Sequence, residues 1–294
     1  MFSKIYGKFL VDSKYITEEQ LASVNEKVSS VRVKLGLIAV AEDMMTEAQA
    51  NNVNRIQAMQ DKRFGDIAVE KGYLTEEQVG QLLAKQGNSY MQFIQTLVDM
   101  GIMTLEDVNN HLNEFKEKKG YTDLDMDLLK SGDVNNEILV LANSGNDYVS
   151  RHLGLAARNV IRFISSDAVI TGVKKVDSIE AEHFGYQTME GNFKAMLGFG
   201  FDDSAIALVA NRFADENYTA ADEDSYDAVC EFTNCINGLF ASELSENDVD
   251  IDMLPPMYKD GAKVTADNMY VMEMCIEGIK VNAVSVVDSE ISIA

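Results

Sequence analysis

A carboxylate and a carboxamide stand three residues apart in residues 227–238, a stretch with the apolar spacing of a long helix. At about 100° per residue, one arc about 60° wide contains Asp227, Glu231, Asn234 and Gly238. We expect the opposite side to be buried; it carries Val229, Phe232, Ile236, Leu239 and Phe240. One face of the helix would then present an acid and an amide side by side, able to hold a water molecule and a charged partner.

Helices are expected in three places around this motif. The motif helix itself should cover about Glu223–Leu244, with Asp222 or Asp224 as its N-cap. Asp147–Ser165 has helical spacing with one apolar face. Ser204–Arg212 is either an apolar strand or the start of a helix.

The other apolar segments of the second half are expected to be strands: Ala168–Val176, His183–Met189, Phe193–Phe201, Val249–Met253, Lys263–Thr265, Met269–Ile276 and Lys280–Val287. Turns are expected at Asp260–Gly261 and Glu277–Gly278, which combine an acidic residue with glycine. This order predicts an α+β domain with long helices packed on a mostly antiparallel sheet.

Charge is unevenly distributed along the 294 residues, which carry a formal net charge of -23. Residues 1–120 contain 14 Lys and Arg against 17 Asp and Glu, whereas residues 121–294 contain 11 against 31. A surface this acidic repels phosphate backbones and anionic lipid, which argues against a nucleic-acid or membrane partner for the second half. No run reaches the roughly 18 apolar residues of a membrane span, so we expect a cytoplasmic protein without membrane insertion.

The three cysteines and three histidines form no zinc-binding spacing. Cys230, Cys235 and Cys275 are interpreted as small buried hydrophobic residues in a reducing compartment. We therefore expect no metal site and no cofactor of the protein's own.

The first 120 residues contain a repeat with a period of 29, since Thr17, Thr46, Thr75 and Thr104 are evenly spaced. Each threonine is expected to cap a helix, and Gln20, Gln49 and Gln78 complete capping boxes in the first three units. Gly72 and Gly101, three residues before their threonines, suit a helix C-cap. Each unit is therefore a short helix, a turn and a longer helix, and the units form an all-α array.

These units resemble the N-terminal domain of type II secretion ATPases (MshEN-like), some of which bind cyclic di-GMP. Arg63-Phe-Gly65 with Ala68-Val69 follows the pattern of a basic residue, Leu and Gly before apolar pairs, and Lys34-Leu-Gly36 follows it more loosely. In a nucleotide-binding version the ligand contacts would fall on Lys34, Gly36, Arg63 and Gly65. The alternative is a structural or partner-docking array, because glycines and capping residues serve the fold in any case.

The repeat ends near Gly120, where Lys116–Asp125 is polar and rich in turn formers. We expect three segments: residues 1–120 as four helical repeats, residues 121–140 as a linker, and residues 141–294 as the α+β domain. Asn135–Asn143 is either an apolar strand or the end of the linker.

The motif Asp227-x-x-x-Glu231-x-x-Asn234, with Pro255 and Pro256 some twenty residues later, resembles the signature of the CheC/CheX/FliY chemotaxis phosphatases. Only one such motif is present, as in the CheX type, and the prolines lie slightly closer to Asn234 than in the family pattern. The resemblance covers about residues 140–294. It implies dephosphorylation of the aspartyl phosphate on the receiver domain of a response regulator, in chemotaxis or another two-component pathway.

The resemblance also implies roles for the residues of the motif. Asn234 would orient the attacking water, because a carboxamide donates and accepts hydrogen bonds without becoming charged, and Glu231 would pair with a lysine of the receiver. Asp227 would support the contact at its edge, and the mid-helix Asn237–Gly238 pair on the exposed side indicates close approach of a partner. Mg²⁺ would belong to the receiver.

Two readings remain open beside the phosphatase. The chain could be a non-enzymatic adaptor that binds a receiver domain, or a signalling scaffold that responds to cyclic di-GMP. The family resemblance also implies a possible homodimer, formed through sheet edges.

Overall fold

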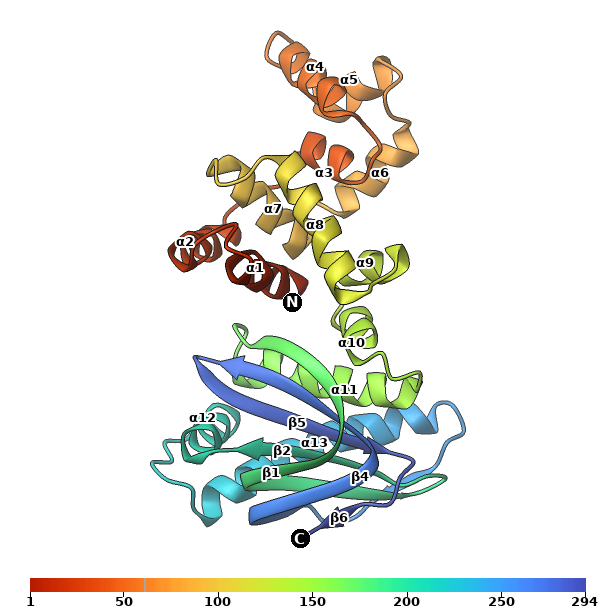
Figure 1. The fold of residues 1–294 in the computed structure, drawn as a ribbon. Coiled ribbons are helices and arrows are strands. Elements are labelled where there is room, and N and C mark those ends of the chain that lie inside the picture. The colour runs from red at the N-terminus through yellow and green to blue at the C-terminus, as the bar shows by residue number, and fades with distance from the viewer. Residues whose placement is uncertain (61) are drawn as a thin grey trace. The chain divides into compact units, whose positions relative to one another are not determined.

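The computed structural model describes residues 1–60 and 62–294. The chain divides into two compact units, Met1–Gly132 and Asp133–Ala294, and the division lies inside the expected linker of residues 121–140. The N-terminal unit is helical (Figure 1), with α1 (Phe2–Asp12), α2 (Glu18–Val28), α3 (Leu35–Ala41), α4 (Glu47–Gln57), α5 (Phe64–Glu70), α6 (Glu76–Ala84), α7 (Ser89–Asp99), α8 (Leu105–Lys119) and α9 (Asp123–Lys130).

The repeat threonines cap the longer helices, as predicted. Thr17, Thr46 and Thr75 each accept a hydrogen bond from the backbone N–H of the glutamine three residues later, and that glutamine's side chain accepts from the threonine N–H. Thr104 forms the same reciprocal pair with Asp107. Gly72 and Gly101 have φ values of 68° and 64°, which confirms that these positions favour glycine.

Close packing explains the repeated glycine of the short helices. A Cβ on Gly7 would lie 2.8 Å from Leu21 Cδ1, one on Gly36 2.9 Å from Phe64 Cε2, and one on Gly65 2.8 Å from Val79 Cγ1. These distances are shorter than real Cβ contacts, so a larger residue would force the neighbouring side chain to shift.

Residues 121–140 are mostly helical rather than an irregular linker. Thr122 caps α9 in a reciprocal pair with Asp125, and α10 (Val134–Ala142) occupies the segment expected as a strand or linker end. The polar composition of this stretch therefore reflects helix caps and exposed helix faces. The apolar run in α10 is short, and such runs do not distinguish helix from strand by periodicity.

The C-terminal unit is α+β, as predicted. Its remaining helices are α11 (Asp147–Asn159), followed directly by a π-helical turn η1 (Val160–Ile164), α12 (Asp203–Ala214) and α13 (Glu223–Ser245). Its strands are β1 (Val169–Gly191), β2 (Ala195–Phe201), β3 (Ile251–Met253), β4 (Met257–Ile276), β5 (Ile279–Val287) and β6 (Ser292–Ile293). The segment left open as strand or helix at Ser204–Arg212 is thus the helix α12.

All strand pairs are antiparallel, in the order β3-β1-β2-β5-β4-β6, and β1 also pairs with β4. The cycle β1-β2-β5-β4 therefore closes on itself. Its interior is filled by apolar residues such as Phe184, Met196, Val271 and Val284.

Two pairs of expected strands are single long strands. Ala168–Val176 and His183–Met189 lie in β1, and Lys263–Thr265 and Met269–Ile276 lie in β4. The expected turn at Asp260–Gly261 is wrong because it also lies inside β4. Asp260 pairs with His183 across the ladder, and Gly261 takes a φ of 58° within the strand. The turn at Glu277–Gly278 is confirmed as the β4–β5 hairpin, with positive φ at both residues.

Helices α11, α12 and α13 pack on the other face of the sheet (Figure 1). On β1, alternate residues Gly185, Gln187 and Met189 are buried on this face. A Cβ on Gly185 would lie 2.7 Å from Val229 Cγ1, so glycine allows α13 to lie directly on the strand. The motif helix is therefore held on a rigid support.

Candidate functional site

The start of α13 is fixed by its cap. Asp222 Oδ1 accepts from the backbone N–H of Ser225 at 3.0 Å, and Ser225 Oγ accepts from the Asp222 N–H at 2.9 Å. Of the two predicted caps, Asp222 is therefore the one used. Asp227 follows within the next turn, so the cap sets where the motif face begins.

The two predicted faces of α13 are largely confirmed. Asp227 and Glu231 are exposed, Asn234 and Gly238 are partly exposed, and the buried side contains Val229, Phe232, Ile236 and Phe240. Leu239 was expected to be buried and is 47% exposed. Asn237 was expected beside Gly238 on the exposed side and is fully buried. The helix is in contact with several strands and with α11, so its buried arc is wider on one side than a single apolar stripe predicts.

Glu231 and Asn234 lie side by side on the exposed face. Asn234 Nδ2 donates to Glu231 Oε2 at 3.3 Å. Asp227 and Glu231 line an open cavity together with Cys230, Pro256, Met257 and Tyr258. The structure thus brings together the predicted acid, the predicted amide and one of the two prolines from the later part of the motif.

Gly238 has open space above it, unlike the repeat glycines. The nearest atom that a Cβ would meet is Met253 Cε at 3.9 Å, an ordinary van der Waals distance. Packing within the chain therefore does not require glycine here.

Apolar side chains border the polar face of α13. Met253, Leu254, Met257 and Tyr258 belong to β3, the start of β4 and the segment between them, and each is at least 40% exposed. Met257 and Tyr258 line the cavity with Glu231, and the four side chains form an apolar rim at this edge of the motif face. Exposed apolar residues beside a polar pair are typical of a protein-docking surface.

The cysteines of the site are poor nucleophiles. Burial, with the nearby Asp227 carboxylate, raises the pKa of the Cys230 thiol to about 11. Burial and the Glu231 carboxylate also raise the pKa of Cys235, whose Sγ lies 3.9 Å from Glu231 Oε1. Both thiols therefore stay protonated near neutral pH, and the thiolate needed for nucleophilic attack is scarce.

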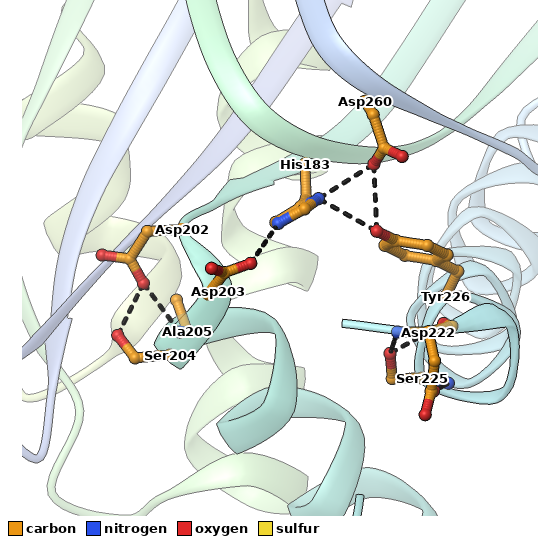
Figure 2. Close-up of polar contacts among 9 residues, drawn as sticks. All are labelled: His183, Asp202, Asp203, Ser204, Ala205, Asp222, Ser225, Tyr226 and Asp260. Carbon is orange, nitrogen blue, oxygen red and sulfur yellow. Dashed lines mark hydrogen bonds and ion pairs between the residues drawn. The ribbon is translucent and has the colours of Figure 1, made fainter. Parts of the chain in front are cut away.

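A charged cluster that the sequence did not reveal ties β1, β4, α12 and α13 together beside the site (Figure 2). His183 Nδ1 lies 2.9 Å from Asp260 Oδ1, and His183 Nε2 lies 2.8 Å from Asp203 Oδ1. Tyr226 donates to Asp260 Oδ1 at 3.0 Å, and its ring stacks on Tyr258 at 4.3 Å between centroids. Since Tyr258 lines the cavity, the cluster anchors one wall of the site.

The cluster favours a protonated histidine. Burial opposes the charge on His183, but hydrogen bonds and the charges of Asp260 and Asp203 outweigh it and raise the pKa. The bond from His183 is the main cause that lowers the pKa of Asp260. Each ring nitrogen faces a carboxylate, so both nitrogens donate and the imidazolium is the form that fits.

A second missed residue, Gln187, touches the motif directly. Its Nε2 donates to Asn234 Oδ1 at 2.9 Å and to the Leu254 carbonyl at 2.8 Å. A signal for it existed in the sequence. Gln187 is a polar residue that alternates with Gly185 and Met189 on one face of the strand. A polar side chain buried on that face requires hydrogen-bonding partners.

The residues expected to contact a cyclic dinucleotide serve structural purposes in the N-terminal unit. Lys34 and Arg63 are the N-cap residues of α3 and α5, and Lys34 Nζ pairs with Asp99 Oδ1 at 2.8 Å. Gly36 and Gly65 occupy the close contacts described above. Lys34 and Gly36 do border two cavities, one of which Arg32, Phe64 and Gln86 also line and the other Gln95 and Asp99. Ligand binding at these residues stays a prediction.

Two kinds of site are not found in the described part of the chain. Within residues 1–60 and 62–294, no group of three or more His, Cys, Asp or Glu side chains is placed to hold a metal ion. Over the same residues, no helix is long and apolar enough to cross a bilayer.

Residues 184–276 match the family model described as "Chemotaxis phosphatase CheX". The matched segment runs from β1 to the end of β4 and contains α13 with the whole motif. This part of the C-terminal unit is therefore CheX-like, in agreement with the resemblance drawn from the motif. The resemblance of the repeats to secretion ATPases stays a prediction.

Solved structures of chemotaxis proteins resemble about half of the chain. CheX from Vibrio vulnificus is 18% identical, with a TM-score of 0.42, over 48% of this chain and 99% of its own. CheX from Desulfovibrio desulfuricans is 14% identical, with a TM-score of 0.42, over 48% and 99%. A CheX–CheY–BeF3–Mg complex from Borrelia burgdorferi is 16% identical, with a TM-score of 0.38, over 49% and 97%. No protein of curated function matches the chain.

Proposed function

We propose that the C-terminal unit hydrolyses the aspartyl phosphate of a response-regulator receiver domain. The observation that carries this proposal is the Glu231–Asn234 pair, set side by side on the exposed face of α13 within the segment that matches the chemotaxis phosphatase family model. The open cavity beside Glu231 and the apolar rim at the edge of the motif face support docking of a protein rather than a small molecule.

The chemistry needs only a positioned water. The water oxygen attacks phosphorus while the bond between phosphorus and the receiver's carboxylate oxygen breaks. The products are inorganic phosphate and the free aspartate, and the proton of the water passes to the phosphate. No covalent intermediate on this chain is required, which fits the protonated state of Cys230 and Cys235.

Each residue of the motif face has a role in this proposal. Asn234 orients the water, Glu231 pairs with a lysine of the receiver, and Asp227 supports the contact at the rim of the cavity. Gly238 leaves room for the partner, since the nearest packed atom that a Cβ there would meet is Met253 Cε at 3.9 Å. Mg²⁺ is supplied by the receiver, and this chain contributes no cofactor.

Phosphate release from a phosphorylated receiver in the presence of Mg²⁺ tests the proposal. We expect the full chain to accelerate release above the receiver's own decay, and Asn234→Ala to lose most of that acceleration, about 100-fold, because the water is no longer positioned. Asn247→Ala is the matched control, an exposed asparagine just beyond the same helix. A wild-type rate equal to the receiver's own decay would show that the chain is not a phosphatase.

A non-enzymatic adaptor is the alternative that the same surface permits. In that case the chain would bind the receiver through Glu231 and the apolar rim, but would leave the rate of phosphate release unchanged. Binding measured beside turnover separates the two functions.

A further inference from the structure

Five polar side chains form one continuous hydrogen-bonded series from the core to the motif. Ser285 Oγ lies 3.0 Å from His152 Nδ1, and His152 Nε2 lies 2.9 Å from Asn237 Oδ1. Asn237 Nδ2 donates to Gln187 Oε1 at 2.9 Å, and Gln187 Nε2 donates to Asn234 Oδ1 at 2.9 Å. The first four residues are at most 1% exposed, and the series ends at the partly exposed Asn234.

The orientation of the side-chain amides in this series is set by two groups that only accept hydrogen bonds. The Leu254 carbonyl faces Gln187 at 2.8 Å, so the Gln187 amide must present its NH₂ there. The second hydrogen of that NH₂ meets Asn234, which must therefore present Oδ1. At the outer end the Glu231 carboxylate faces Asn234 Nδ2 at 3.3 Å, which requires the same orientation. The Leu254 carbonyl and the Glu231 carboxylate therefore require the same orientation of Asn234, and hydrogen-bonding chemistry alone fixes both amides.

The inner half of the series follows from the same constraint. With its NH₂ turned to Leu254, Gln187 offers Oε1 to Asn237, so Asn237 turns its NH₂ to Gln187 and its Oδ1 to His152. His152 must then carry its proton on Nε2 and accept from the Ser285 hydroxyl on Nδ1. Burial lowers the pKa of His152 to about 4, so the ring is neutral and each nitrogen has one role.

We propose that Gln187 is the positioning residue for the Asn234 carboxamide, held in its own orientation by the buried series Asn237–His152–Ser285. The kinetic effect of this positioning role rests on the proposed phosphatase function. A flip of the Asn234 amide would place its NH₂ against the NH₂ of Gln187 and its oxygen against Glu231, so the flipped form is disfavoured at both contacts. Asn234 Oδ1 keeps a second lone pair for a hydrogen of the attacking water, and Nδ2 stays on the side of Glu231.

Kinetics on the full chain test the positioning role. Gln187→Leu removes the donor, and we expect kcat to fall about tenfold while KM for the phosphorylated receiver stays within about twofold, because docking through Glu231 is untouched. Thr233→Val is the matched control. Thr233 is fully buried on α13, the helix that carries Asn234, and its hydroxyl donates to the Val229 carbonyl, outside the series. An equal kcat in folded wild type and Gln187→Leu, or an equal loss in Thr233→Val, would overturn the proposal.

Gln187→Glu gives a signature that loss of packing alone does not produce. The ionised carboxylate faces two acceptors, Leu254 O and Asn234 Oδ1, whereas the protonated carboxyl can again donate to one of them. We expect kcat of this variant, relative to wild type, to rise as pH falls and the buried carboxyl becomes protonated. A ratio that does not change with pH contradicts the role assigned to the Gln187 donor.

Nuclear magnetic resonance tests the arrangement without any turnover. In ¹H–¹⁵N spectra of the full chain, the Asn234 side-chain amide is identified by its loss in Asn234→Ala. We expect Gln187→Leu to shift that signal and Thr233→Val to leave it in place, and we expect His152 in wild type to be protonated on Nε2. An unshifted Asn234 amide, or a proton on His152 Nδ1, would refute the series. If the wild type lacks phosphatase activity but these spectra are as expected, only the proposed function fails.

Discussion

Glu231 and Asn234 differ in what each can contribute to a reaction with a phosphorylated partner. A carboxylate is acceptor-only and attracts a cation, whereas a carboxamide carries both donors and an acceptor. Asn234 is hydrogen-bonded at both ends, to Gln187 and to Glu231, and Glu231 also faces the open cavity. At the scale of single residues, the proposed function therefore gives docking and water positioning to different side chains.

Removal of the Glu231 charge should separate these two roles. We expect Glu231→Gln to raise KM for the phosphorylated receiver about 10- to 100-fold, the value of one charge-assisted hydrogen bond, with a smaller change in kcat. Steady-state kinetics with varied receiver concentration measure both constants. Glu243→Gln, about three turns further along α13, is the control. A large fall in kcat with an unchanged KM would assign Glu231 to the chemical step instead.

The His183 cluster predicts a pH dependence of stability. His183 has a raised pKa, so its contribution is full below the unfolded-state value near 6.5 and is lost as pH rises through the higher folded-state pKa. Asp260 has a lowered pKa, so its contribution is lost only as pH falls through that lower folded-state pKa. The groups facing His183 are Asp203 on α12, Asp260 on β4 and Tyr226 on α13.

The measurement is the difference in Tm between wild type and His183→Gln across pH. We expect wild type to be the more stable at about pH 6 and the difference to shrink as pH rises through the raised folded-state pKa of His183, because the neutral ring can no longer donate to both carboxylates. Because the His183→Gln variant carries the same other charges, the difference in Tm removes the effect that the high negative charge of the chain has on stability at each pH. A difference that grows with rising pH would show that His183 is neutral in the folded protein.

At the scale of elements, glycines in helices have two different causes. In the short repeat helices α3 and α5 a Cβ would collide with a side chain of the next packed helix. In α13 the position of Gly238 is open, although a mid-helix glycine costs about 1 kcal/mol relative to alanine. The first kind is explained by packing inside the chain, and for the second the proposed docking of a partner supplies the reason.

A pair of alanine substitutions distinguishes these causes. Gly65→Ala should lower the free energy of unfolding by about 1–3 kcal/mol, because its Cβ would lie 2.8 Å from Val79 Cγ1. Gly238→Ala should raise it by up to about 1 kcal/mol and should lower the rate of phosphate release. Urea denaturation followed by circular dichroism gives the energies. If Gly238→Ala kept full activity, its proposed clearance role would be wrong.

At the scale of the whole molecule, the proposed site lies entirely within one of the two units. The motif, the buried series and the His183 cluster all belong to Asp133–Ala294. Most of the acidic residues that argue against a nucleic-acid partner also lie there, since residues 121–294 contain 31 Asp and Glu. The repeat unit Met1–Gly132 contributes no residue to the proposed chemistry.

We therefore expect residues 133–294, produced alone, to keep the kcat of the full chain within about twofold. Phosphate release under identical conditions provides the comparison, and circular dichroism provides the control for folding. A strong fall in kcat with the fold intact would show that the repeat unit acts on the site.

Calorimetry of residues 1–132 with cyclic di-GMP tests the separate prediction that Lys34, Gly36, Arg63 and Gly65 contact a nucleotide. The absence of binding heat at high ligand concentration would contradict that prediction.

Local signals in the sequence determined the capped repeat helices and the motif face. The threonines with glutamine three residues later predict helix starts, because capping is a bond between near neighbours. The arc of Asp227, Glu231 and Asn234 follows from the geometry of one helix. These features depend on residues within a few positions of each other, so the chain order is sufficient to predict them.

Contacts between distant residues were decided by the tertiary structure alone. Gln187 and Asn234 are 47 positions apart and His183 and Asp260 are 77 apart, and both pairs depend on how β1 lies against α13 and β4. Asp260–Gly261 has the composition of a turn, yet β1 pairs with β4 on both sides of Gly261 and the strand continues through it. Asn237 is polar but lies on the side of α13 that packs on the sheet. The sequence alone therefore placed the acid and the amide on one face, and only the packed sheet decided which side chain holds the amide in position.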